Sequence, residues 1–412
     1  MIGLTLPESL MLALRWALLL GPVGLVLAMV KIRGTSERRQ IGGLFAFLYG
    51  VPMIFVTHSF ALHFGWWRYG WDTLMINNIP ADIVIGGAIL FGPGLYFSFP
   101  NTRPYMICLP IVLGLHGTVF NSLEPLVFAG PYWYWGVILV FIVAHLPALY
   151  LAKWTEEDQH LPLRCALLAI MTGGMIFAIV PALIMQAMGG NWDLLNRPDW
   201  ATATACVALV FVSVIGLSAN QSLCLHGNGT PIPLDPTKRL VTTGIYAYVS
   251  NPMQLSAALA FLILGLFLWN IWIMAAALMA WIFVQGMVRW HHRHDLLKRF
   301  PQEWIIYKEN VPEWVPRWKP WIKVEATVFL SSDRQLLRWL LSYATGLQVR
   351  DGPGKAIYNN PADRRGFRGA PAVIAAVSHI NFLWMVIAAA LMLPVLAVPY
   401  LANLRRTTGD LT

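Results

Sequence analysis

The sequence predicts an all-α polytopic membrane protein of about nine transmembrane helices, with a small α/β domain at the C-terminus. The 412 residues are 57% hydrophobic and only 12% charged, whereas soluble domains are about half apolar and a quarter charged. The apolar residues gather in long runs. The 19 Trp, 20 Phe and 13 Tyr suit a protein with two membrane–water interfaces. This composition excludes disordered, fibrous and ordinary cytosolic proteins.

Runs of about 20 apolar residues are long enough to cross the hydrocarbon of a bilayer. They predict spans near residues 9–30, 43–64, 82–99, 106–123, 134–152, 164–187 and 201–220. The run 253–289 is long enough for two crossings, and Asn270 near its middle predicts the turn of a helical hairpin. The last apolar stretch, 380–401, is either a tenth span or a helix lying on the membrane. Pro394 and Pro399 argue against a straight crossing and favour the second interpretation.

Basic residues give the chain a net charge of +9 and predict its orientation. One set of alternate loops holds Lys31, Arg33, Arg38, Arg39, Arg103, Lys153, Lys238 and Arg239, and the other holds only Arg68 and Arg197. Because cytoplasmic loops are enriched in Lys and Arg, the N-terminus is expected outside and everything after Arg289 in the cytoplasm. The basic residues are therefore expected to contact membrane lipids and not nucleic acid.

Cysteine and histidine spacing predicts neither a disulfide framework nor a metal site. Cys108, Cys165, Cys206 and Cys224 lie far apart, without a CxxC motif. His291, His292 and His294 are candidate metal ligands, but the remaining histidines do not form the regular boxes of di-iron membrane enzymes. Polar residues at a helix exit near lipid phosphates are the preferred interpretation.

Changes in composition divide the chain into three predicted domains. Residues 1–155 form an N-terminal transmembrane bundle, and residues 156–322 a membrane core with a cytoplasmic loop and tail. Residues 323–412 form a small domain that begins with an extended segment at Ala326–Leu330 and ends in an apolar helix.

The loop 226–252 is the longest non-apolar stretch between spans. Gly227 and Gly229 allow close backbone approach, and Pro231, Pro233 and Pro236 stiffen the chain after them. We expect a loop of fixed shape over the membrane surface; a mere connector between two spans is the alternative.

Two motifs flank the predicted hairpin. The first reads Leu240-Val-Thr-Thr-Gly244-Ile-Tyr246-Ala-Tyr248-Val-Ser-Asn251-Pro252-Met253, and the second reads Leu296-Leu-Lys-Arg-Phe300-Pro-Gln-Glu-Trp304-Ile-Ile-Tyr307-Lys-Glu-Asn-Val311-Pro312. Together they resemble the integral-membrane methyltransferases, which include the isoprenylcysteine carboxyl methyltransferases and the phospholipid N-methyltransferases. The resemblance covers roughly residues 200–321, and the upstream Gly227-x-Gly229-Thr-Pro resembles a bacterial branch of the family.

The resemblance implies methyl transfer from S-adenosylmethionine to a lipophilic acceptor at the cytoplasmic membrane face. The acceptor would be a lipid amine, a prenyl-type carboxylate or an isoprenoid, and the location a bacterial inner membrane. The implied catalytic residues are Asn251 and Tyr307. The implied cofactor-binding residues are Gly244, Tyr246, Tyr248, Asn251, Pro252, His292, Arg293 and Trp304. Aromatic faces suit a sulfonium cation, and interfacial anchoring is the alternative role for these aromatic residues.

The sequence departs from the family pattern at its polar positions. Ser250 and Gln254 stand where the family has Arg and Tyr, and His292 and Arg293 stand where it has a pair of Glu. Asp295 lies close by and is a candidate substitute carboxylate. The alternative function is therefore a non-catalytic membrane scaffold or assembly factor derived from a methyltransferase.

The flanking regions carry weaker resemblances. The segment Val328-Phe-Leu-Ser-Ser-Asp333 is similar to the thioredoxin-like DCC family, with Arg334 and Leu337 in place of its two cysteines. Thiol exchange needs thiolates, so this domain is expected to be structural or to dock a protein partner; an unrelated α/β appendage is the alternative. The segment His63–Asp82 is similar to small membrane lycopene cyclases, but Ala81-Asp82 replaces their Glu pair, and an interfacial aromatic belt is the simpler interpretation.

Overall fold

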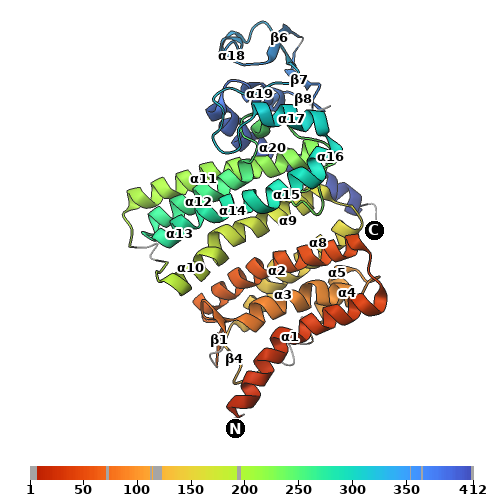
Figure 1. Ribbon diagram of the computed structural model, residues 1–412, viewed down its shortest axis with the longest axis vertical. Helices are drawn as coiled ribbons and strands as arrows, with labels where there is room; N and C mark the ends of the chain where they lie inside the picture. The colour runs from red at the N-terminus through yellow and green to blue at the C-terminus, as the bar shows by residue number, and fades with distance from the viewer. Residues whose placement is uncertain are drawn as a thin grey trace. The chain divides into compact units, whose positions relative to one another are not determined.

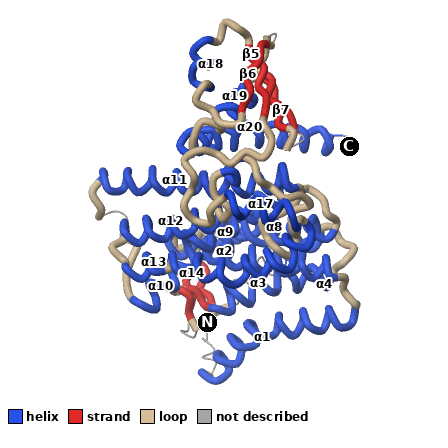
Figure 2. Tube along the Cα trace, turned by 45° about the horizontal axis from the view of Figure 1, so that its top comes forward, coloured by secondary structure: helices blue, strands red, loops and turns tan. Residues whose placement is uncertain are grey.

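The computed structural model describes residues 7–70, 74–111, 114, 123–192, 196–352, 354–362 and 365–409. The chain divides into two compact units, Met1–Asn191 and Trp192–Thr412. Both are mostly helical (Figures 1 and 2). The domain boundaries predicted at 155 and 322 are not tested by this division and stay predictions.

The first unit is a helical bundle with two short strand pairs. Its helices are α1 (Glu8–Arg33), α2 (Glu37–His63), α3 (Gly87–Ile89), α4 (Leu95–Ser98), α5 (Pro104–Ile111), α7 (Trp133–Val140), α8 (Leu146–Glu156), α9 (Leu161–Gly174) and α10 (Val180–Met188). The wider turns η1 (Asp82–Gly86), η2 (Leu90–Gly94), η5 (Phe141–His145) and η6 (Met175–Ile179) continue these helices. Strand β1 (Trp67–Tyr69) pairs antiparallel with β4 (Val127–Ala129), and β2 (Met75–Ile76) with β3 (Ile79–Pro80).

Small residues allow the helices of this bundle to approach closely. Helix α2 packs on α8 at Gly42, where a Cβ would lie 2.5 Å from the carbonyl oxygen of Ala152. Farther along α2, Gly50 faces Ala88 of α3. Such contacts between small residues are typical of helix packing in membranes, because close backbone approach replaces the hydrophobic effect as the main source of attraction.

The second unit begins with long helices and ends with a small sheet. Its helices are α11 (Asp199–Ser222), α12 (Pro252–Phe267), α13 (Ile271–Ala275), α14 (Ala277–Phe283), α15 (Arg289–His291), α16 (Leu297–Arg299), α17 (Pro301–Asn310), α18 (Gln335–Leu341), α19 (Ala370–Val377) and α20 (Phe382–Gly409). The turns η7 (Leu223–Gly227), η8 (Gly244–Ala247), η9 (Val284–Val288) and η10 (His292–Leu296) join them. Helices α11, α12 and α14 run alongside one another (Figure 1).

The predicted helical hairpin turns at Asn270, as expected. The Asn270 side chain accepts hydrogen bonds from the backbone N–H groups of Trp272 and Ile273, at 3.0 and 3.1 Å. It thereby caps α13, the first segment of the returning helix. Gly265 of α12 allows the two arms to meet, since a Cβ there would lie 2.5 Å from the backbone nitrogen of Met274.

The sheet of the second unit has the strand order β6-β5-β7-β8. Strand β5 (Ala326–Leu330) is the extended segment predicted from the sequence. It pairs parallel with β6 (Leu347–Asp351) and antiparallel with β7 (Ile357–Asn360), which in turn pairs antiparallel with β8 (Arg365–Arg368). Helices α18 and α19 pack with the buried face of β5 and with Tyr358.

Six helices in the described residues are long and apolar enough to cross a membrane: Glu8–Arg33, Glu37–His63, Trp133–Glu156, Leu161–Met188, Asp199–Gly227 and Ile271–Arg299. The apolar helices Asp82–Ser98, Pro252–Phe267 and Phe382–Val395 are shorter. Within the span predicted at 106–123, the structure describes only residues 106–111, Gly114 and Leu123. Most of this predicted span therefore lies outside the described residues. The chain is thus an integral, multi-pass membrane protein, and the count of nine stays a prediction.

Candidate functional site

The loop after α11 folds back on itself at its two glycines. A Cβ on Gly229 would lie 2.4 Å from the Cα of Thr237. The two sides of this loop can therefore approach each other only because residue 229 has no side chain. The backbone N–H of Lys238 donates to the carbonyl of Gly227 at 2.7 Å. The loop 226–252 therefore has a fixed shape, as its composition predicted.

Gly244 opens the segment that carries most of the predicted site residues. Its φ of +61° lies in the left-handed region, which favours glycine. The short helix η8 follows directly and buries Tyr246, and Asn251 then precedes α12, with Pro252 as the first residue of that helix.

The tail after the hairpin packs on this segment, although some 60 residues separate them in sequence. The Tyr307 hydroxyl donates to the carbonyl of Tyr246 at 2.8 Å, within a buried environment. Backbone hydrogen bonds of 2.8–2.9 Å join Ser250 to Pro312, Arg317 to Tyr248 and Trp321 to Ala247. The two motifs that flank the hairpin thus form one continuous structure.

Aromatic side chains gather where the loop and the tail meet. Trp304 and Tyr307 are buried, and their ring centroids are 5.8 Å apart. The His292 ring lies 4.5 Å from that of Trp304, and the Trp321 ring lies 5.9 Å from that of Tyr307. Burial raises the pKa values of Tyr246 and Tyr307 above their usual range, and the protonated Tyr307 phenol is the donor to the Tyr246 carbonyl.

Two polar atoms just before α12 are buried without a partner among the described residues. They are the Nδ2 of Asn251 and the Oγ of Ser250, whose residues are only 2% and 8% exposed. A buried polar group without a partner costs about 1–3 kcal/mol. Such atoms in a native fold call for an explanation, and a bound polar ligand is one.

Residues 200–301 match the family model of the phospholipid methyltransferases. This segment of the chain is thus similar to a membrane phospholipid methyltransferase. The match runs from α11 to the first residue of α17, so it includes the loop, the hairpin and the predicted positions from Gly244 to Arg293. No curated protein and no solved structure matches the chain.

The junction of loop and tail has a carboxylate beside its aromatic cluster that the sequence motifs did not single out. Glu313 lies 2.5 Å from the ammonium of Lys308 and 3.8 Å from the guanidinium of Arg289. Burial alone would raise the pKa of Glu313, but the Lys308 hydrogen bond and the charges of Lys308, Arg289 and His292 lower it below its ordinary value. Asp295, the predicted substitute carboxylate, pairs instead with Arg299.

The predicted site residues do not all lie together. Tyr246, Trp304, Tyr307 and His292 belong to the junction of loop and tail. Arg293 is exposed on the helix that enters this junction. Tyr248 points to the C-terminal domain: its hydroxyl donates to the Ser378 carbonyl at 2.6 Å, and its ring lies 5.8 Å from that of Phe382.

A small cavity of about 100 Å³ lies between the loop 226–252 and the C-terminal sheet with its helices α19 and α20. Gly244, Ala247 and Tyr248 line one side, and Tyr358 and His379 line the other. Small-molecule sites usually enclose about 300–1,000 Å³. This cavity is therefore smaller than a nucleoside-sized cofactor requires.

Sequence reasoning missed three residues at the junction: Glu313, Trp321 and the unpartnered Ser250. For Glu313 a signal was available, since it follows directly on the Val311-Pro312 motif. Ser250 was noted only as a departure from the family pattern, and nothing in the sequence indicated that its hydroxyl would be buried.

Proposed function

We propose that the protein transfers a methyl group from S-adenosylmethionine to a lipophilic acceptor at the cytoplasmic face of the membrane. The family match to residues 200–301 supports methyl transfer to a lipid-like substrate. Within that class, a lipid amine, a prenyl-type carboxylate or an isoprenoid is the proposed acceptor. The observation that carries the proposal is the packing of the tail on the loop through the hydrogen bond from Tyr307 to Tyr246.

The residues of the junction fit the proposed cofactor in chemistry. The unpartnered Asn251 Nδ2–H donates to an acceptor, and the Ser250 hydroxyl both donates and accepts. The cofactor offers carboxylate and ribose oxygens to such groups. The buried faces of Trp304 and Tyr307 suit its sulfonium.

When bound, S-adenosylmethionine would supply a methyl group on a sulfonium. The acceptor would form the new bond to this carbon as the carbon–sulfur bond breaks, and S-adenosylhomocysteine would leave as a neutral thioether. The chain's own part is to align the two reactants and to exclude water. Tyr307 holds the tail against the loop, which brings Trp304 over the junction. Because Asn251, Trp304 and Tyr307 do not line the described cavity, we expect the contacts between loop and tail to rearrange around the cofactor.

Calorimetry on the purified full-length protein tests cofactor binding. S-adenosylmethionine is expected to release or absorb measurable heat at millimolar concentration. Asn251→Ala should weaken binding, whereas Asn191→Ala, which changes an exposed asparagine outside the methyltransferase domain, should not. Absence of heat, together with unchanged cellular function in Asn251→Ala and Tyr246→Ala, would overturn the enzymatic proposal in favour of the non-catalytic scaffold.

The C-terminal domain is proposed to be a thioredoxin-like docking module. Its strands and helices follow the order β5-α18-β6 and then β7-β8-α19, with a parallel pair and an antiparallel pair. This order supports the thioredoxin-like proposal. Arg334 and Leu337 lie at the start of α18, where a redox-active domain of this kind would carry its cysteines. A protein partner is therefore a more fitting role than thiol exchange.

A further inference from the structure

The first unit contains a cavity of about 510 Å³ that takes no part in the proposed methyl transfer. Its volume lies in the range of small-molecule sites, about 300–1,000 Å³. The walls are largely apolar and come from α1, α2, the helix that begins at Asp82, and α7. A membrane bundle normally fills such a space with side chains.

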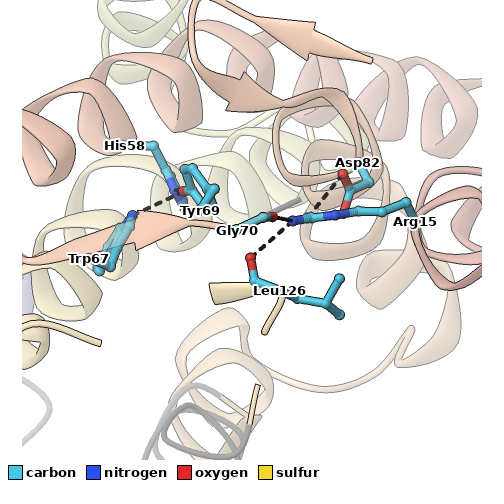
Figure 3. Close-up of polar contacts among 7 residues, drawn as sticks. All are labelled: Arg15, His58, Trp67, Tyr69, Gly70, Asp82 and Leu126. Carbon is cyan, nitrogen blue, oxygen red and sulfur yellow. Dashed lines mark hydrogen bonds and ion pairs between the residues drawn. The ribbon is translucent and has the colours of Figure 1, made fainter. Parts of the chain in front are cut away.

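One side of this cavity carries a buried ion pair (Figure 3). The Arg15 guanidinium of α1 lies 3.0 Å from the Asp82 carboxylate, and both side chains are 3% exposed. The same guanidinium donates to the carbonyls of Gly70 and Leu126 at 3.1 and 3.0 Å. Charged residues inside a membrane bundle are costly and in most cases functional.

One N–H donor of Arg15 takes no part in these hydrogen bonds. The Nε–H of Arg15 is buried and has no acceptor among the described residues. Since Arg15 and Asp82 balance each other's charge, an anionic or cationic ligand would add an uncompensated charge. A neutral oxygen acceptor would instead satisfy the remaining donor.

A second polar group lies on the same side of the cavity. The Tyr69 hydroxyl accepts from the indole N–H of Trp67 at 3.0 Å and shares a short hydrogen bond with the Nδ1 of His58. Tyr69 and His58 both line the cavity. Strand β1 thereby supports both polar groups, because Tyr69 is followed by Gly70, whose carbonyl holds Arg15.

We propose that this cavity binds a neutral lipophilic molecule with one hydrogen-bond-accepting oxygen, such as a long-chain alcohol or ketone. The oxygen lies at the Arg15 end and the hydrocarbon lies along the apolar walls. The site belongs to the first unit alone. The proposal of this site can therefore be tested independently of the proposed methyltransferase activity.

The probe for this site is a photoreactive sixteen-carbon alcohol that carries a diazirine. Two matched probes have the same chain, one with a terminal carboxylate and one without oxygen. Full-length protein in phosphatidylcholine nanodiscs is irradiated with each probe, and the labelled peptides are mapped by mass spectrometry. We expect the alcohol to label α1 and the helix from Asp82 in a saturable way. Its labelling should be about fivefold stronger than that by either matched probe, because the alcohol gains one buried hydrogen bond.

Two glycines of α1 provide a matched pair of variants. Gly21 lines the cavity, Gly24 does not, and a Cβ at either position would meet nothing within 4 Å. Gly21→Leu fills the space and should lower labelling about tenfold, whereas Gly24→Leu should leave it unchanged. Arg15→Lys keeps the positive charge beside Asp82 but lacks the Nε–H, so it should remove the preference for the alcohol.

Three outcomes would overturn the proposal. Equal labelling by the chain without oxygen would mean that lipid tails fill the cavity. Equal effects of Gly21→Leu and Gly24→Leu would place the label on the outer surface of α1. Labelling confined to other segments would mean that no ligand enters the cavity.

Discussion

At the scale of single residues, the junction of loop and tail depends on a few buried polar contacts. Tyr307 reaches from α17 to the Tyr246 carbonyl, and its ring also packs between those of Trp304 and Trp321. The hydroxyl and the ring therefore have separable effects, which substitution of the hydroxyl alone can measure.

Tyr307→Phe keeps the ring and removes the hydrogen bond to Tyr246. The buried carbonyl then loses its donor, which should lower the free energy of unfolding by about 1–2 kcal/mol. We also expect slower methyl transfer, since the tail is held less firmly. Thermal unfolding in detergent measures the first effect, and transfer of radiolabelled methyl measures the second. Tyr343→Phe is the control, because Tyr343 is 54% exposed; an equal effect of both variants would contradict the prediction.

The lowered pKa of Glu313 predicts that the stability of the fold depends on pH in the acid range. Its folded-state pKa lies below the ordinary value of 4.5, so its ionised form stabilises the fold above that value. The contribution is lost as the pH falls from 4.5 through the lower folded-state pKa. Glu313→Gln should therefore be less stable than the parent at neutral pH, and the difference should shrink below pH 4.5. Unfolding midpoints measured across pH provide the check, and a difference that grows in acid would contradict it.

At the scale of elements, the hairpin of α12 and α13 has its turn fixed by one side chain. Asn270 caps the returning helix, while Gly265 allows the arms to meet. The loop and the tail leave from the other end of this hairpin, next to Pro252 and after Arg299. The geometry of the turn thus helps to bring the two flanking motifs together.

Asn270→Ala removes the cap and should lower the free energy of unfolding by about 1 kcal/mol. Asn270→Ser can still accept a hydrogen bond from the first turn and should recover most of the loss. Thermal unfolding of the three proteins distinguishes these outcomes. If the serine variant is as unstable as the alanine variant, the cap is not the source of the effect.

At the scale of the whole molecule, the distribution of basic residues predicts the orientation in the membrane. The loop with Arg197 should lie outside, and the C-terminal domain should lie in the cytoplasm. Asn191 and Ser332 are exposed residues in these two regions. They offer positions at which each side of the membrane can be probed in living cells.

Asn191→Cys should react with a membrane-impermeant maleimide in intact spheroplasts. Ser332→Cys should react only after the membrane is permeabilised, because the reagent cannot reach the cytoplasm. Labelling is read from a gel shift against the same protein with Cys206→Ser, because Cys206 is exposed whereas the cysteines at 108, 165 and 224 are buried. The opposite pattern would reverse the proposed orientation.

The sequence predicted what depends on local pattern and missed what depends on side-chain direction. The strand at Ala326–Leu330 and the turn at Asn270 follow from periodicity and polarity, and both are found. Tyr246 and Tyr248 are two residues apart in the same motif, yet one belongs to the junction and the other contacts Ser378. Only the course of the short helix η8 decides between these directions.

Arg15 was missed because its partners are remote in sequence. A single arginine in an apolar run indicates function or pairing, and that signal was available. Its acceptors, however, are Asp82 and the carbonyls of Gly70 and Leu126, and no local pattern links these positions.

The three partners of Arg15 also set an order of events during synthesis. The guanidinium enters the bilayer with the first helix, but its last acceptor, Leu126, lies 111 residues later in the chain. An arginine at mid-membrane costs about 2.5–3.5 kcal/mol during insertion. Until the ribosome has produced the segment around Leu126, the Arg15 guanidinium either lacks this acceptor inside the bilayer or remains in contact with water. Helix α1 is therefore expected to join its neighbours late, although it is made before them.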